Sequence, residues 1–242
     1  MQMESLYPIV IVRRASAVCL TEEHWTPINL CLEVEKMIKI TTLEVAGIGP
    51  AIHAMRNPYD SWEKSDTCHG RIGDADKELS EKLSAAGTEH CKHLRMCMVW
   101  AEIEAPLYWW KEFDTYRMGV EKLSCSTMHT IMKKPLQLSD FSCEKLTVIG
   151  TQRLQETIET LNEYRRLYDQ VSDKELRKLY WWQFIQLLPS SYNQRRTVMM
   201  SYAALRQICK QRKGHKLDEW HTFIDWCKTL PESWMILNEE KE

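Results

Sequence analysis

APLYWWKEFDTYRMG, residues 105–119, sets a proline ahead of a run of aromatic and charged residues and a glycine behind it. Proline is favoured at the first position of a helix and glycine just past its end, so we expect a helix over 106–118 that stops at Gly119. Aromatic residues recur every three or four positions and share one face of this helix: Trp109, Phe113 and Tyr116. Charged residues share another face: Lys111, Asp114 and Arg117. The helix is therefore either a packed amphipathic element or one that brings polar groups to a ligand.

The residues before this helix predict strands and short helices. MIKITTLEV (37–45) is rich in β-branched residues and predicts a first strand. LRMCMVWAEIEAP (94–106) alternates in apolar character and predicts a half-buried strand. GIGPAIHAMR (47–56) predicts a short helix, because its proline falls in the first turn. A further helix is expected to start at a cap formed by Asp74 or Asp76 and to stop before the next glycine.

The C-terminal half predicts a helical body. Apolar residues recur at helical spacing over four segments, and a proline or a glycine ends three of them. The expected helices cover residues 151–168, 174–188, 192–213 and 215–230. We therefore predict an α+β fold, with a small early β-sheet and a helical body.

Composition and charge exclude several classes of protein. The chain has 242 residues, of which 44% are hydrophobic and 27% charged, as in ordinary globular proteins. A net charge of -2 gives no general attraction to nucleic acid or to anionic membranes. No apolar run is long enough to cross a membrane, and no secretory signal peptide is recognisable. Nine scattered cysteines without a Cys-x-x-Cys pair favour reduced thiols, so we expect a cytoplasmic protein.

The N-terminal segment does not join naturally to the rest of the chain. We expect one domain over residues 37–242, beginning at Met37. Residues 1–36 are then an extension of that domain or the result of an upstream start. The alternative is that these residues form a genuine N-terminal strand and turn.

The first cluster of candidate binding residues follows the helix that ends at Gly119. Small hydroxyl groups donate hydrogen bonds without bulk and suit anionic or oxygen-rich ligands. The residues of this cluster are Ser124, Ser126, Thr127 and His129.

The second cluster is GTEHCKH, residues 87–93. Its glutamate, two histidines and neighbouring cysteines are metal-ligand types, but their spacing fits no standard zinc signature, so we predict no metal site. A structural histidine is the simplest interpretation. Contact of His90 with a ligand phosphate or a flavin is the functional alternative.

The third cluster lies in residues 187–220. Asn193, Arg195 and Arg196 fall at the start of an expected helix, where backbone amides favour anions, and guanidinium groups bind phosphate bidentately. Cations also close this helix, where they complement its dipole: Arg212, Lys213 and His215. We expect the start of the helix to bind a substrate phosphate.

Four stretches, in this order, resemble the flavin-dependent thymidylate synthases, the family that uses FAD. AMRNPYDS (54–61) is similar to the family's early Ala-Arg-x-x-Tyr segment, and AAGTEH (85–90) to its helix-Gly-…-Glu-His turn. EAPLYWWKEFDTYRMGVEKLS (104–124) lies where the family has Arg-His-Arg, about seven residues, then Ser. LLPSSYNQRRTVMMSYAALRQICKQR (187–212) is similar to its Leu-Pro-…-Tyr-Thr-…-Arg-Ser-Leu-…-Leu-Arg segment. Together they span most of residues 37–220.

The chain departs from the family at functional positions. The signature Arg-His-Arg reads Thr115-Tyr116-Arg117, so only the last arginine is kept. Three residues match the signature serine approximately: Ser124, Cys125 and Ser126. The arginine of the late triplet, which in the family helps to bind the dUMP phosphate, falls on Ala203. Arg195 or Arg196 would then take over that phosphate.

The resemblance implies reductive methylation of dUMP, or of a related pyrimidine nucleotide, with bound FAD and with NADPH and methylenetetrahydrofolate as co-substrates. It implies catalytic roles for Arg117, Ser124 and Ser126. It implies contacts to the cofactor from Arg56, His90, Tyr116 and Arg212. The pyrimidine nucleotide would be bound by Asn193, Arg195 and Arg196. It also implies a homotetramer with active sites between subunits.

Two other functions stay open. The same fold could serve as a non-catalytic oligomer that binds a nucleotide or a flavin, which the lost Arg-His would suit. The chain could also be a helical interaction protein in which all three clusters belong to core and surface.

Overall fold

The structure is a computed structural model and describes residues 38–237. The expected N-terminal extension, 1–36, lies outside the described residues. The strands are β1 (Lys39–Ala46), β2 (Met98–Pro106), β3 (Val120–Ser124) and β4 (Asn193–Ser201). The α-helices are α1 (Ile48–Ala54), α2 (Asp74–Ala85), α3 (Leu107–Phe113), α4 (Thr127–Thr130), α5 (Val148–Gln170), α6 (Lys174–Leu187), α7 (Tyr202–Arg212) and α8 (Asp218–Lys228). The predicted α+β fold is confirmed.

The four strands form one antiparallel sheet in the order β1-β2-β4-β3. Along β2, Val99, Ala101 and Ile103 are fully buried, whereas the residues between them are half-buried. This period of two places one face of the sheet on the core and leaves the other more open. A half-buried strand forms as predicted, but it starts at Met98 because residues Lys92–Arg95 form a 3-10 turn, and Met98 and Trp100 lie on its half-buried face rather than its buried one.

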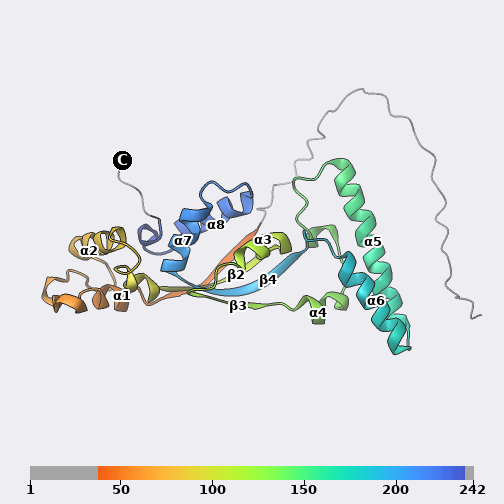
Figure 1. The fold of residues 1–242 in the computed structure, drawn as a ribbon, viewed down its shortest axis with the longest axis horizontal. Coiled ribbons are helices and arrows are strands. Elements are labelled where there is room, and N and C mark those ends of the chain that lie inside the picture. Colours follow the sequence, from red (N-terminus) through yellow and green to blue (C-terminus); the bar gives the residue numbers. More distant parts are fainter. Residues whose placement is uncertain (1–37, 238–242) are drawn as a thin grey trace, which may run out of the picture. The chain divides into compact units, whose positions relative to one another are not determined.

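Helices α3, α7 and α8 lie on one side of the sheet in Figure 1. Their apolar faces meet in an aromatic core whose rings are fully or almost fully buried: Trp109, Trp110, Phe113, Trp220 and Phe223. Trp109 alone has its ring centroid within 6 Å of those of the other four rings. The aromatic face of the first quoted stretch is therefore core, and replacing one of these rings by alanine would cost about 3–5 kcal/mol.

Helices α5 and α6 form a hairpin with a smaller core of its own. Leu154, Ile158, Leu161 and Phe184 are buried in it. The hydroxyl of Thr147 caps α5, and the carboxylate of Asp173 accepts a hydrogen bond from the Leu176 amide at 2.8 Å to cap α6. The helices predicted over 151–168 and 174–188 are confirmed to within a few residues. None of the helices in residues 38–237 is both long and apolar enough to cross a bilayer.

The helix predicted over 192–213 is wrong in its first half. Residues 193–201 form β4, and the helix starts only at Tyr202, where the Ser201 hydroxyl accepts a hydrogen bond from the Ala204 amide. These residues form a strand rather than a helix because β4 lies between β2 and β3 and pairs with both through backbone hydrogen bonds. Arg195 and Arg196 consequently do not lie at a helix N-terminus.

Other boundaries differ in smaller ways. The helix predicted over 106–118 ends at Phe113, and Pro106 is both the last residue of β2 and the cap position of α3. Strand β3, which follows Gly119, was not predicted. The cap position of α2 is Gly73 rather than an aspartate, because Asp74 is already the first helical residue and the Asp66 carboxylate accepts hydrogen bonds from the Ala75 and Asp76 amides.

Candidate functional site

A large groove is lined by the end of α2, the turn before β3, and helices α7 and α8, and has a volume of about 2040 Å³. Five cationic side chains line it: Arg95, Arg206, Lys210, Lys213 and Lys228. We call it the basic groove. Its one acidic lining residue, Asp225, pairs with Lys228 at 2.7 Å. The remaining cations give the groove a positive charge that attracts anions.

Two of these cations lie on one face of α7, and a third is at its C-terminal cap position. Arg206, Lys210 and Lys213 follow at intervals of four and three residues, which is the spacing of a helix face. The opposite face of α7 is apolar, and Leu205 and Ile208 on it are fully buried. The amphipathic pattern of α7 thus fixes the helix on the sheet and points its cations into the groove.

Arg206 is the most enclosed of these cations. Its two terminal nitrogens donate to the backbone carbonyls of Met235 and Ser84, both at 3.4 Å. Burial lowers the pKa of Arg206, although a guanidinium remains protonated in proteins. Among residues 38–237, no carboxylate forms an ion pair with it within 4.0 Å. Its remaining donor capacity is available to an anion in the groove.

Gly119 brings the turn before β3 against the start of α7. Its φ is +70°, and an added Cβ would lie 2.5 Å from the Ser201 hydroxyl oxygen. A side chain is therefore excluded on both backbone and steric grounds. The neighbouring Met118 is strongly exposed and lines the groove. Gly119 was predicted as a helix stop, but α3 ends at Phe113, and Gly119 instead packs against Ser201 at the start of α7.

His93 lies behind the groove and is buried. Its Nε2 is 2.8 Å from the Ser80 hydroxyl, and its Nδ1 has no hydrogen-bond partner in the described part of the chain. Burial, together with the charge of Arg206, lowers the pKa of His93 to about 4. The folded protein therefore holds this imidazole neutral at neutral pH.

This pKa predicts a pH dependence of stability. The unfolded chain binds a proton at His93 near the usual pKa of 6.5, but the folded chain does so only near 4. The free energy of unfolding should therefore fall as the pH is lowered from about 6.5 to about 4, and be fully present above that range. Urea titrations at several pH values give the slope of the free energy of unfolding against pH. His93→Gln should make this slope smaller between about pH 4 and 6.5, whereas the control His129→Gln, at an exposed site, should leave it unchanged. Equal slopes in all three proteins would contradict the assignment.

Tyr116 and Arg212, two predicted cofactor contacts, lie together. Arg212 donates from Nε to the Tyr116 hydroxyl at 2.9 Å and from Nη1 to Glu112 Oε2 at 2.8 Å. The same carboxylate oxygen accepts from Trp220 Nε1 at 3.1 Å and lies 3.2 Å from His215 Nε2. These groups thus satisfy one another in a network that joins α3, α7 and α8.

The predicted substrate contacts divide between the two faces of β4. Arg195 is exposed on the open face and pairs with Glu104 at 3.0 Å. Arg196 points to the opposite face, pairs with Asp114 at 2.9 Å and lies 4.2 Å above the Trp110 ring. Asn193 accepts a hydrogen bond from the Ser142 hydroxyl at 2.9 Å. Adjacent strand residues point to opposite faces, so the two arginines cannot grip one phosphate together.

Ser124 and Ser126 lie at the far end of β3 from the groove. Ser124 pairs with Arg196 in the sheet and is exposed, and Ser126 is half-buried at the start of α4. Strand geometry separates Ser124 from Val120 beside the groove by roughly 13 Å. Within one chain, these serines and the basic groove are separate.

The remaining predicted contacts fall in three environments. Arg117 is exposed, and its side chain makes no hydrogen bond or ion pair within residues 38–237. His90 is exposed between Thr88 and Cys91, both of which line the groove. Arg56 is 5% exposed and pairs with the buried Asp76 at 2.6 Å.

No cluster of three or more histidine, cysteine or acidic side chains in the described residues is placed to hold a metal ion. The described cysteines are all free thiols: Cys68, Cys91, Cys97, Cys125, Cys143, Cys209 and Cys227.

Sequence reasoning missed most residues of the basic groove. The helix predicted over 192–213 already contained Arg206, Lys210 and Lys213 at the spacing of one face, but the phosphate site was predicted at Arg195 and Arg196 instead. Arg95 and Lys228 carried no such signal, because only the tertiary fold brings them to α7.

This chain shares its fold with solved structures, among them two crystal structures. Both are of the flavin-dependent thymidylate synthase ThyX from Helicobacter pylori in complex with FAD and dUMP. Each matches with a TM-score of 0.62 at 19% sequence identity, over 84% and 83% of this chain and 97% and 98% of theirs, respectively. At this identity the similarity establishes the fold alone. No protein-family model matches the sequence, nor does any curated protein sequence.

Proposed function

We propose that the protein is a flavin-dependent enzyme of the thymidylate synthase type, which transfers a one-carbon unit reductively to dUMP or a related pyrimidine nucleotide. The observation that carries this proposal is the basic groove, an anion-attracting site of large volume in a fold whose solved neighbours hold FAD and dUMP. A groove of about 2040 Å³ exceeds the roughly 300–1,000 Å³ of a pocket for one drug-sized ligand. It has room for a dinucleotide and a mononucleotide.

The donor set of the groove fits FAD. Lys210 and Lys213 would neutralise the two phosphates, and His90, which is exposed and next in sequence to the lining residue Cys91, would contact the cofactor. When bound, the flavin supplies the hydride chemistry, for which no protein side chain is a substitute. The protein's part is to hold the nucleotide beside the cofactor and to exclude water from the reacting face.

Arg206 is the best candidate for the nucleotide phosphate. The family arginine that this chain lacks would stand at Ala203, and Arg206 follows one helical turn later on the same face. Both residues line the groove. Arg195 and Arg196 are weaker candidates, because both already pair with carboxylates and neither lines the groove. The unpaired Arg117 would act on the same ligands from the turn before β3.

The separated serines fit a site completed by a second subunit. In the homotetramer that we propose, Ser124, Ser126 and Asn193 of one copy would approach ligands held in the groove of another. NADPH and methylenetetrahydrofolate would be the reductant and the carbon donor.

Analytical ultracentrifugation should give a single species of four chains, and a monomer at micromolar concentration would refute this part of the proposal.

A non-catalytic flavin- or nucleotide-binding protein is the second candidate. The observation in its favour is that Tyr116 and Arg212, which the resemblance predicts as cofactor contacts, already satisfy each other and Glu112. Binding without turnover would be its signature.

Flavin binding is tested by the absorbance spectrum of the purified protein, before and after incubation with FAD and desalting. We expect a retained oxidised-flavin spectrum in at least one of the two samples. A colourless protein that cannot be loaded with FAD would remove both the enzyme and the flavin-binding alternative, and would leave the similarity as one of fold only.

A further inference from the structure

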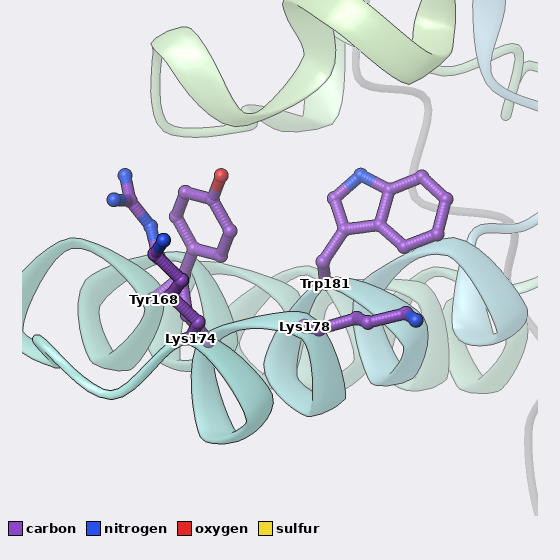
Figure 2. Close-up of a pocket in the computed structure, with 5 residues that line it drawn as sticks. Tyr168, Lys174, Lys178 and Trp181 are labelled. Atoms are coloured by element: carbon purple, nitrogen blue, oxygen red, sulfur yellow. The ribbon is translucent and has the colours of Figure 1, made fainter.

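A second pocket lies on the hairpin of α5 and α6. It has a volume of about 310 Å³, and its lining consists of Tyr168, Lys174, Arg177, Lys178 and Trp181. Figure 2 shows the rings of Tyr168 and Trp181 projecting to the same side of the hairpin, with open space between them. The basic groove is lined by none of these residues, so the two sites are independent.

The residues that line this pocket carry positive charge. Three of its five lining residues are cations, and none is acidic. Two nearby carboxylates are engaged elsewhere: Asp169 pairs with Arg165 at 3.0 Å, and Asp173 caps α6. The ammonium groups of Lys174 and Lys178 belong to exposed residues on α6, where they are free to move onto an anion.

The two aromatic rings add a surface for a flat group. The Arg177 guanidinium lies 4.3 Å from the centroid of the Tyr168 ring, which is the distance of a cation-π contact. Tyr168 and Trp181 are both only half-buried, so each keeps part of its ring open to the pocket. Trp181 meets the adjacent Trp182 edge-on, with ring centroids 4.9 Å apart. An indole beside cations is the arrangement that stacks a base while the cations meet its phosphate.

We propose that this pocket binds a nucleotide unit, with the base at Tyr168 and Trp181 and the phosphate at Lys174 and Lys178. Its volume is at the lower limit for small-ligand pockets and suits one nucleotide rather than a dinucleotide. The unit is either a free nucleotide or one residue of a single-stranded nucleic acid. Both would present a base to the aromatic rings and a phosphate to the lysines, and the experiment below distinguishes the two ligands.

The test uses the full chain and two fluorescent probes, ethenoadenosine triphosphate and a short fluorescein-labelled oligothymidylate, followed by anisotropy. Lys174→Ala/Lys178→Ala should weaken binding by about tenfold or more, because two phosphate contacts are lost. Its control removes two exposed cations, one before α5 and one in its second turn, by Lys145→Ala/Arg153→Ala, and should change binding less than about twofold.

A second pair of variants tests the base. Trp181→Leu should weaken both probes by about fivefold or more, the scale of a lost stacking contact. Trp182→Leu alters the adjacent indole, which is 44% exposed but does not line the pocket, and should have little effect. Retained FAD loading in all four variants would show that the fold and the basic groove are intact.

The outcomes are distinct. Similar affinity for the two probes assigns a free nucleotide, and an oligothymidylate affinity at least about tenfold higher assigns a single strand. Absence of binding to either probe at about 1 mM overturns the proposal, since that affinity is the weakest of functional interest. Binding that is indifferent to the α6 variants but lost in Arg206→Ala also overturns it, because the probes would then occupy the basic groove.

Discussion

Asp76→Asn should lower the free energy of unfolding by about 3–5 kcal/mol, the cost of leaving a buried charge without its partner. Asp76 is fully buried, and its Oδ1 accepts from Arg56 Nε at 2.6 Å. Its Oδ2 accepts from the Ser65 and Thr67 hydroxyls, both at 2.6 Å, and from the Thr67 amide at 3.1 Å. An asparagine keeps one acceptor and presents an NH₂ group to the other donors. The loss is a large share of a total stability of roughly 5–15 kcal/mol.

Urea unfolding of the variant tests this value, with Asp169→Asn as the control. Asp169 forms an exposed ion pair with Arg165, so its replacement should cost less than about 1 kcal/mol. Burial alone would raise the pKa of Asp76, but the hydrogen bonds from Ser65, Thr67 and Arg56 and the charge of Arg56 hold it below its usual value. The contribution of the Asp76 carboxylate to the free energy of unfolding is therefore fully present above the pKa of the unfolded state. It is lost as the pH falls through the lower pKa of the folded state. A difference between wild type and Asp76→Asn that persists at the lowest pH would contradict this.

Arg206→Ala should weaken the binding of dUMP by about 10- to 150-fold, the equivalent of a charge-assisted hydrogen bond of about 1.5–3 kcal/mol. The guanidinium lines the basic groove, and its present hydrogen bonds to two carbonyls, at 3.4 Å, are long. Isothermal titration calorimetry of the FAD-loaded protein measures the effect.

The nucleoside gives the matched control for this prediction. Deoxyuridine has no phosphate, so its affinity should be unchanged in Arg206→Ala. In the wild-type protein, the Arg196 guanidinium donates hydrogen bonds to Asp114 and Gln194. Arg196→Ala should therefore leave the ratio of nucleotide to nucleoside affinity unchanged. An equal loss for nucleotide and nucleoside in Arg206→Ala would show that Arg206 shapes the groove without touching the phosphate.

Local signals in the sequence predicted much of the fold. Helix α6 begins at Lys174 behind the capping Asp173 and ends just before Pro189, as its boundary residues required. Strand β1 followed from β-branched content alone. Strand β3 could not be predicted, because it has five residues and only Val120 is buried, so its pairing with β4 leaves no hydrophobic pattern.

The misassigned start of α7 shows why Arg195 and Arg196 were predicted at a helix N-terminus. The alternating buried residues Gln194, Val198 and Met200 were present in the sequence, but the strong helical pattern after Tyr202 was extended backwards over them. Contacts between distant segments leave no local signal at all. The ion pair of Arg56 with Asp76 spans 20 residues, and the network around Glu112 joins residues more than 95 apart in sequence.

The central claim is that the protein methylates dUMP by flavin chemistry, and tritium release from [5-³H]dUMP tests it most directly. The FAD-loaded protein should release tritium to water when methylenetetrahydrofolate and NADPH are both present, and release should fall in Arg206→Ala at subsaturating dUMP. Replacement of the C5 hydrogen is what the proposed methylation requires. The claim would be contradicted if the protein binds FAD and dUMP but releases no tritium with either oxidised or pre-reduced flavin. The protein would then be a binding protein with the fold of an enzyme.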